Sequence, residues 1–247
     1  MYQQLVPVSK EKHARKRVKQ IDSFAFASRF QLASVMAHEF ARAAAIYPIV
    51  FIDDKARQGL TPVALMGLEE GENLYVDAAG RWHASYVPAV IRRYPFALAA
   101  TGKADQFTVC IDEGSPLVTD SDGNALFDDG GQPTAVIENV KKYLGELQQM
   151  DTLTREFCRF IREHDLFTPL KLQVRQGGTV RTLAGSMVIN EERLGKVSDE
   201  VFLEMRRRGY VPVVYAHLVS LGQIERLMML KDERTTGVKG AAPGADE

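Results

Sequence analysis

Residues 38–96 decide the fold class of this chain, through HEFARAAAIYPIVF (38–51), TPVALMGLEEGENLYV (61–76) and GRWHASYVPAVIRRYPF (80–96). The alanine-rich pattern before Tyr47-Pro48 predicts a helix over residues 30–46, which ends there because a residue that precedes proline is pushed out of the helical conformation. Short apolar runs follow, separated by acidic, glycine-bearing turns, at 49–52, 62–68 and 74–76. Such a succession of short strands is typical of an antiparallel meander.

The rest of the chain alternates in blocks of strands and helices. Residues 107–112 predict a further strand, and an apolar stripe over 134–164 predicts helical structure, with polar Gln148–Asp151 as a break between two helices. Further predicted elements are a hairpin of 170–174 with 180–189, a helix over 199–208 capped by Ser198 and stopped by Gly209, a strand over 211–215 and a helix over 216–230. This order favours an α+β fold with a mainly antiparallel mixed sheet and packed helices, as a single large domain or two closely packed halves.

The two ends of the chain differ from its middle in composition. Residues 1–20 carry a run of basic side chains, which fits either a solvated N-terminal arm or an electrostatic contact with an acidic partner. Residues 231–247 are polar and rich in Gly, Ala and Thr, which predicts a disordered tail. We therefore expect the folded domain over 21–230, with any sub-boundary near 130–150.

The bulk composition argues against several classes of partner. The 31 Lys and Arg residues balance 32 Asp and Glu residues, so nucleic acid is not expected as a partner. The longest apolar run, residues 43–52, is about half of the roughly 20 residues that a membrane span needs, and no secretory signal precedes it. We expect a cytoplasmic protein without a membrane span. Cys110 and Cys158 stand in apolar contexts and are expected to be buried free thiols.

The densest cluster of recognition-type side chains consists of Trp82, Tyr86, Arg92, Arg93 and Tyr94. Tryptophan and tyrosine offer large amphipathic faces, and arginine offers a planar fork for carboxylates or phosphates. We predict that this cluster binds a peptide, a protein or a small molecule. The alternative is that the aromatic rings fill the core while the arginines stack over it and pair with acidic residues. The oligomeric state does not follow from the sequence.

Motifs for catalysis and metal binding are incomplete. His38-Glu39 resembles the start of the zinc-binding pattern His-Glu-x-x-His, but Arg42 stands where the second histidine is needed, so no metal site is predicted and a Glu39–Arg42 ion pair is expected. Asp112 follows a predicted strand, and His217 lies on an apolar helical face. For these two residues and for His38, a structural role competes with a catalytic one. No cofactor motif is present, so no cofactor is predicted, and catalysis stays open.

Taken together, these segments resemble the SapC family of bacterial proteins over roughly residues 2–230. The resemblance is carried by several short motifs: His38-Glu39-Phe40, Tyr47-Pro48-Ile49-Val50-Phe51, Pro62-Val63-Ala64-Leu65-Met66-Gly67-Leu68, Trp82, Tyr86-Val87-Pro88-Ala89, Arg92-Arg93-Tyr94-Pro95-Phe96, Cys110-Ile111-Asp112, Leu166-Phe167-Thr168-Pro169 and Tyr215-Ala216-His217-Leu218-Val219-Ser220-Leu221. Many members are encoded near TonB-dependent receptors, which implies an accessory role in receptor-associated uptake or modification. The family name instead implies a surface-layer component. No catalytic residue set comes with the resemblance.

The leading prediction is a SapC-like accessory protein that binds a peptide, protein or small ligand through the Trp82–Tyr94 cluster. The alternatives are an enzyme that modifies a peptide or a small acidic substrate, and a surface-layer component. A concave pocket that combines Arg92 or Arg93 with a carboxylate or His217 favours the enzyme. A flat apolar patch over Trp82 favours partner binding.

Overall fold

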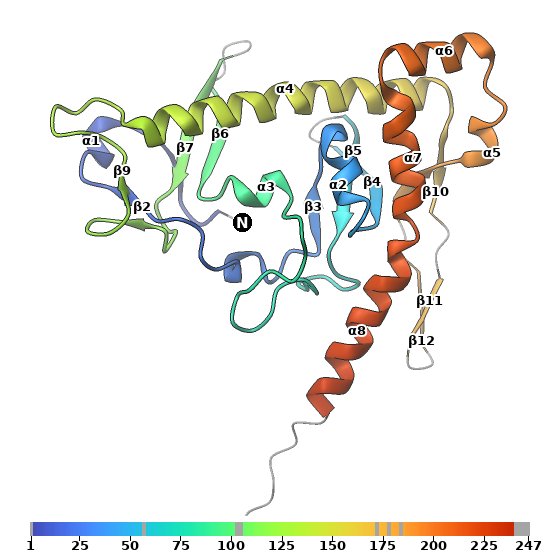
Figure 1. Ribbon diagram of the computed structural model, residues 1–247, viewed down its shortest axis with the longest axis horizontal. Coiled ribbons are helices and arrows are strands. Elements are labelled where there is room, and N and C mark those ends of the chain that lie inside the picture. The colour runs from blue at the N-terminus through green and yellow to red at the C-terminus, as the bar shows by residue number, and fades with distance from the viewer. Residues whose placement is uncertain are drawn as a thin grey trace, which may run out of the picture.

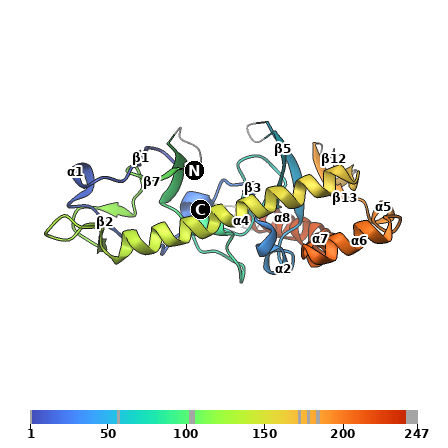
Figure 2. The same cartoon turned by 90° about the horizontal axis from the view of Figure 1, so that it is seen from above.

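The 29-residue helix α4 (Ala135–Glu163) runs along most of the long axis of the molecule (Figure 1, Figure 2). The computed structural model describes residues 2–55, 58–101, 106–170, 173–176, 179–182 and 185–239. The inward positions of α4 are spaced three and four residues apart, as in any amphipathic helix. They are Ile137, Val140, Leu144, Leu147, Asp151, Thr154, Cys158 and Ile161. The predicted break at Gln148–Asp151 is wrong, because the helix continues through these polar residues.

The N-terminal half of α4 covers the first of two hydrophobic cores. An antiparallel sheet in the order β1-β7-β6 belongs to this core, and a second small sheet has the order β8-β2-β9. Fully buried Ile111 and Leu126 pack there with Ile137 and Leu144 of α4. The elements of this half are β1 (Leu5–Pro7), α1 (Lys10–His13), β2 (Arg17–Val18), β6 (Phe96–Ala100), β7 (Phe107–Asp112), β8 (Val118–Thr119) and β9 (Asn124–Ala125).

The C-terminal half of α4 covers the second core, which is built on a five-stranded antiparallel sheet in the order β10-β13-β4-β5-β3. Apolar β4 is the central strand and pairs with β5 from Ile49 opposite Ala64 onward. Phe157 of α4 packs its ring 6.2 Å from Phe40 and 6.4 Å from Phe51. The elements of this half are β3 (Leu32–Ser34), α2 (Phe40–Ala43), β4 (Ile49–Asp54), β5 (Gly59–Leu65), β10 (Phe167–Pro169), β13 (Ser186–Ile189), α5 (Glu191–Leu194), α6 (Asp199–Arg207), α7 (Tyr210–Ser220) and α8 (Gln223–Lys239).

Short connecting elements fill the space between the two cores. They are the 3₁₀ helices η1 (Ala25–Ala27) and η2 (Ala37–Glu39) and the single-turn helix α3 (Ala89–Arg92). Residues 74–76, predicted as a strand, contribute only one isolated bridge, between Val76 and Trp82. The chain therefore enters α3 from an irregular segment.

Three further predicted elements take another form. Residues 30–46 are not one helix: Leu32–Ser34 is strand β3, paired with β5, and only the residues from Ala37 to Ala43 are helical. Residues 211–215, predicted as a strand, lie within α7. The predicted hairpin near 170–189 is formed by β11 (Gln173–Gln176) with β12 (Thr179–Thr182), while β13 pairs with β4 and β10 instead. Its expected joint at Gly177-Gly178 lies outside the described residues.

The two chain ends are more ordered than the composition predicts. The basic N-terminal segment is not a separate arm, since β1 pairs with β7 and His13 is fully buried. Helix α8, which projects from the body in Figure 1, continues to Lys239, so the predicted disordered tail is helical over 231–239. Arg234 fastens this helix by donating to the carbonyl oxygens of Asn73 at 3.0 Å and Val76 at 2.8 Å. Residues 240–247 lie outside the described part of the chain.

The predicted α+β class is confirmed, with antiparallel pairing throughout the described sheets and with the two cores joined by α4. Ser198 caps α6 by accepting from the Val201 N–H at 3.4 Å, and Gly209 ends the following turn at a φ of 71°, as predicted. Cys110 and Cys158 are buried free thiols, also as predicted. Among the helices of the described residues, none combines the length and the apolarity needed to cross a bilayer.

Candidate functional site

The doubled arginine Arg92-Arg93 stands at the end of α3, and the start of α3 is fastened by a buried carboxylate. Glu39, 1% exposed, accepts the Ala89 N–H at 2.8 Å through Oε1 and the Met36 N–H at 2.9 Å through Oε2. Tyr86 donates its hydroxyl to the same Oε1 at 2.5 Å. The expected Glu39–Arg42 ion pair is therefore wrong, because the carboxylate turns into the protein while Arg42 is exposed.

One pocket, of about 390 Å³, opens beside the two arginines, and we call it the basic pocket. Its lining residues come from β2, the segment after β2, α3, β6 and the N-terminal half of α4. They are Val18, Lys19, Gln20, Ile21, Phe24, Arg92, Arg93, Tyr94, Pro95, Phe96, Val140, Tyr143 and Leu144. Three of these are cationic and none of the described lining residues is acidic. The pocket thus combines positive charge with an apolar, aromatic wall.

The charges of the basic pocket are only partly neutralised. Lys19 pairs with Asp122 at 3.0 Å, but Arg92 donates to the Val87 carbonyl at 2.9 Å and lies over the rings of Tyr86 and Tyr143, at 5.5 Å and 6.0 Å. Among the residues that the structure describes, neither Arg92 nor Arg93 forms an ion pair with a carboxylate. An anion in this pocket would therefore meet two arginines with unused charge.

Two buried donors at this pocket lack hydrogen-bond partners within the described chain. They are the Nε of Arg93 and the hydroxyl of Tyr143. Burial raises the pKa of Tyr143, although the Arg92 cation opposes the rise, so its hydroxyl keeps its proton at neutral pH. Burial also raises the pKa of Tyr2, whose hydroxyl lies near the Arg93 guanidinium and donates to the Phe96 carbonyl at 2.9 Å. Buried donors without a partner are uncommon in proteins, so these two groups make this wall of the basic pocket unusual.

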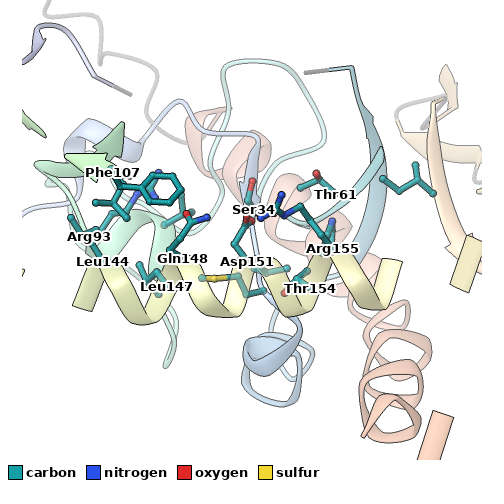
Figure 3. Close-up of a pocket in the computed structure, with 16 residues that line it drawn as sticks. Ser34, Thr61, Arg93, Phe107, Leu144, Leu147, Gln148, Asp151, Thr154 and Arg155 are labelled. Carbon is teal, nitrogen blue, oxygen red and sulfur yellow. Dashed lines mark ion pairs between the residues drawn. The ribbon is translucent and has the colours of Figure 1, made fainter. Parts of the chain in front are cut away.

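A second pocket, of about 220 Å³, lies where the two cores meet beneath the middle of α4, and we call it the seam pocket. Figure 3 shows Arg93 and Phe107 at one end and Asp151 and Arg155 toward the other. Its polar lining residues are Ser34, Thr61, Arg93, Gln148, Asp151, Thr154 and Arg155, and its apolar ones are Val35, Met36, Leu60, Pro62, Val90, Leu98, Phe107, Leu144 and Leu147. Arg93 and Leu144 line both pockets.

The polar residues of α4 are organised at the seam pocket. Asp151 Oδ2 lies 3.4 Å from Arg155 Nε, one turn further along the helix. The Thr154 hydroxyl accepts the Ala37 N–H at 2.9 Å and donates to the Met150 carbonyl at 2.7 Å, so it ties η2 to α4. The seam pocket thus holds a formed ion pair at one end and the Arg93 cation at the other.

The five predicted binding residues divide into two groups. Arg92, Arg93 and Tyr94 line the basic pocket, whereas Trp82 and Tyr86 line neither pocket. Trp82 packs edge-on against Phe24, with ring centroids 5.3 Å apart, and so supports that pocket-lining residue from behind. Burial and the Glu39 carboxylate raise the pKa of Tyr86. The cluster is therefore part pocket wall and part support.

Asp112, which the sequence left open, is a structural carboxylate. It is fully buried and accepts the Gln3 N–H at 3.1 Å and the Gln4 N–H at 2.7 Å. Tyr94 donates its hydroxyl to Asp112 Oδ2 at 3.2 Å while its ring stacks on Phe26, with centroids 4.1 Å apart. Asp112 therefore fixes the orientation of Tyr94 from behind the basic pocket.

His217 and Ser220 likewise have structural roles, as hydrogen-bond acceptors in the second core. His217 Nε2 accepts the Ile189 N–H at 3.0 Å, and the Ser220 hydroxyl accepts the Ile49 N–H at 3.0 Å and donates to the His217 carbonyl. His38 is exposed. Within the described residues, no group of three or more His, Cys, Asp or Glu side chains is placed to hold a metal ion.

Several pocket residues did not stand out in the sequence. Tyr143 looked like one more member of an apolar stripe, and Asp151, Thr154 and Arg155 looked like the surroundings of a helix break. The helical spacing of these residues could have identified them. Asp151 and Thr154 continue the inward series of Leu144 and Leu147 in steps of three and four. Polar residues in an unbroken inward series indicate a polar cavity rather than a break.

Comparison with known proteins identifies a family but no individual relative. A family model described as SapC matches residues 8–227, which is most of the chain. No curated protein and no solved structure shows a significant match.

Proposed function

The chain belongs to the SapC family, and from that premise we propose that it binds an organic anion with an aromatic or apolar body in the basic pocket. One observation carries the proposal: three cationic and no acidic side chains line this pocket, and Arg92 and Arg93 are not in ion pairs with described residues. A carboxylate would bind the guanidinium groups through charge-assisted hydrogen bonds. The body of the ligand would pack against Phe24, Phe96 and Tyr143.

The ligand of such an accessory protein would carry a negative charge. An anionic small molecule or the carboxyl end of a peptide fits the chemistry of the pocket. The bound molecule would then be passed on in a receptor-associated uptake or modification pathway, the role that the family resemblance implies. A surface-layer role has only the family name in its favour.

Calorimetric titration with a charged and a neutral probe tests the proposal. We expect phenylacetate to bind at least tenfold more tightly than phenylacetamide, because a hydrogen bond to a charged group contributes about 1.5–3 kcal/mol and 1.4 kcal/mol is tenfold. Arg92→Gln should weaken phenylacetate binding by a similar factor. Arg159→Gln, on the exposed face of α4, is the matched control and should leave binding unchanged. Equal affinity for the two probes would contradict the proposal.

A second candidate function is an enzyme that modifies a peptide or a small acid. The seam pocket favours it, since Arg93 and a carboxylate, Asp151, line the same concave site. Mass spectrometry on short peptides incubated with the protein tests this candidate. Peptides recovered unchanged after long incubation would count against catalysis while leaving a binding role in place.

A further inference from the structure

Helix α4 carries polar side chains at two inward positions where its pattern otherwise places apolar ones. Asp151 and Thr154 stand between Leu147 and Cys158 in the inward series. Thr154 has a structural role, because its hydroxyl binds the Ala37 N–H. Asp151 forms an ion pair with Arg155 at 3.4 Å, lines the seam pocket and keeps 25% of its side chain exposed. A carboxylate at an inward position costs free energy relative to an apolar residue, and such departures concentrate at functional sites.

Arg93 enters the same pocket from the opposite wall. It follows α3 directly, is half-buried, and has a buried Nε without a hydrogen-bond partner in the described chain. Figure 3 shows it beside Leu144, away from Asp151 and Arg155. The pocket therefore presents an unneutralised cation at one end and a carboxylate, held by Arg155 at 3.4 Å, toward the other. This polarity matches a ligand that is negative at one end and positive at the other.

The dimensions of the pocket limit the length of such a ligand. Leu144 and Asp151 are seven positions apart on α4, which is about 10 Å at 1.5 Å per residue. Two residues of extended peptide span at most about 7 Å, and the arginine and aspartate side chains reach the remainder. The volume of about 220 Å³ corresponds to roughly seven water molecules at about 30 Å³ each. The pocket is thus smaller than a site for a drug-sized molecule.

We propose that the seam pocket binds a short linear peptide of about two residues with both ends free. Its carboxylate lies at Arg93 and its ammonium group at Asp151, which can accept from Arg155 and from the ligand because a carboxylate has about four acceptor sites. An apolar side chain packs against Leu98, Phe107 and Leu147. The site is separate from the basic pocket and shares Arg93 with it, so the proposal does not rest on anion binding there.

Calorimetric titration with one dipeptide and its two blocked forms tests this proposal. We expect L-alanyl-L-leucine to bind, and both N-acetyl-L-alanyl-L-leucine, without the ammonium group, and L-alanyl-L-leucine amide, without the carboxylate, to bind at least tenfold more weakly. Asp151→Asn, which keeps the side-chain shape, should weaken the free dipeptide at least tenfold and leave the N-acetyl form unchanged. Arg159→Gln is the control for general charge effects, and thermal melts confirm that each variant is folded.

Three results would overturn the proposal: no binding of the free dipeptide, equal affinity for the free and blocked forms, or full binding by folded Asp151→Asn protein. The comparison of free and blocked dipeptides needs only the wild-type protein, so it stands even where a variant fails to fold. Arg92 lines only the basic pocket and Asp151 lines only the seam pocket, so titration of both ligands against Arg92→Gln and Asp151→Asn separates the two sites. Dipeptide binding that is lost in Arg92→Gln but kept in Asp151→Asn rejects the peptide site alone, and phenylacetate binding that is lost in Asp151→Asn but kept in Arg92→Gln rejects the basic pocket alone.

Discussion

Replacement of Glu39 by alanine is expected to lower the free energy of unfolding by about 3–5 kcal/mol. The substitution leaves the Met36 and Ala89 N–H groups and the Tyr86 hydroxyl without their acceptor. Each buried donor without a partner costs about 1–3 kcal/mol, and removal of one member of a buried charged network is among the most destabilising changes known. The same change releases the start of α3, so it should also weaken ligand binding by Arg92 and Arg93.

Urea denaturation of the wild type and three variants measures this effect. Glu39→Gln keeps one acceptor oxygen and should cost less than Glu39→Ala. Glu156→Gln replaces an exposed carboxylate of α4 and should change stability by less than about 0.5 kcal/mol. A loss below about 1 kcal/mol for Glu39→Ala would show that Glu39 does not hold α3 in place.

The second large effect is a loss of stability in acid that depends on His217. Burial lowers the pKa of His217 from 6.5 to about 4, because its ring is enclosed in the second core, and the backbone of Ile49 opposes this shift only in part. In the unfolded chain the ring titrates near its ordinary pKa. The native state therefore binds this proton less readily than the unfolded state, and the stability contributed by neutral His217 is complete above pH 6.5 and lost as the pH falls toward 4.

The size of this effect follows from the difference between the two pKa values. A shift from 6.5 to about 4 corresponds to about 3 kcal/mol at 1.36 kcal/mol per pH unit. We expect the wild type to lose that much more stability than His217→Gln between pH 7 and pH 4, because glutamine can accept the Ile189 N–H without titrating. Urea denaturation at several pH values measures the difference, with exposed His38→Gln as the control. If the free energy of unfolding falls equally with pH in the wild type and in His217→Gln, His217 does not cause the loss of stability in acid.

Where local sequence pattern and tertiary packing agree, the sequence predicted the fold. The first three residues of β4 and the last five of β5 are buried and belong to short apolar runs, and α6 has a polar cap at Ser198 and a glycine stop at Gly209. Residues 30–46 show the opposite case. Their alanines favour a helix. Leu32–Ser34 instead pairs with β5, and the hydrogen bonds of this pairing outweigh the helix propensity of the alanines.

The helix α7 shows how composition misleads when an element is apolar on several faces. Its β-branched start suggests a strand, yet it packs as a helix against α2, β4 and β13, with Pro212 in the first turn, where proline is tolerated. Periodicity cannot separate a short buried helix from a strand when nearly every position is apolar. The contacts that decide between them are distant in sequence.

The candidate site was predictable in part. The chemistry of Arg92, Arg93 and Tyr94 identified three residues that line the basic pocket, because a doubled arginine next to an aromatic residue stands out in the sequence. The position of Trp82 behind Phe24 could not be predicted from the sequence, because the segment before α3 is irregular and has no helical or strand periodicity. The seam pocket was missed because it exists only where two cores, built from distant segments, meet beneath α4.

A crystal structure of the protein grown with phenylacetate would show whether the basic pocket binds organic anions. We expect the carboxylate of phenylacetate within hydrogen-bond distance of the Arg92 or Arg93 guanidinium and its ring against Phe24 or Tyr143. Phenylacetate bound elsewhere, or a basic pocket that stays without ligand at saturating phenylacetate, would contradict this expectation.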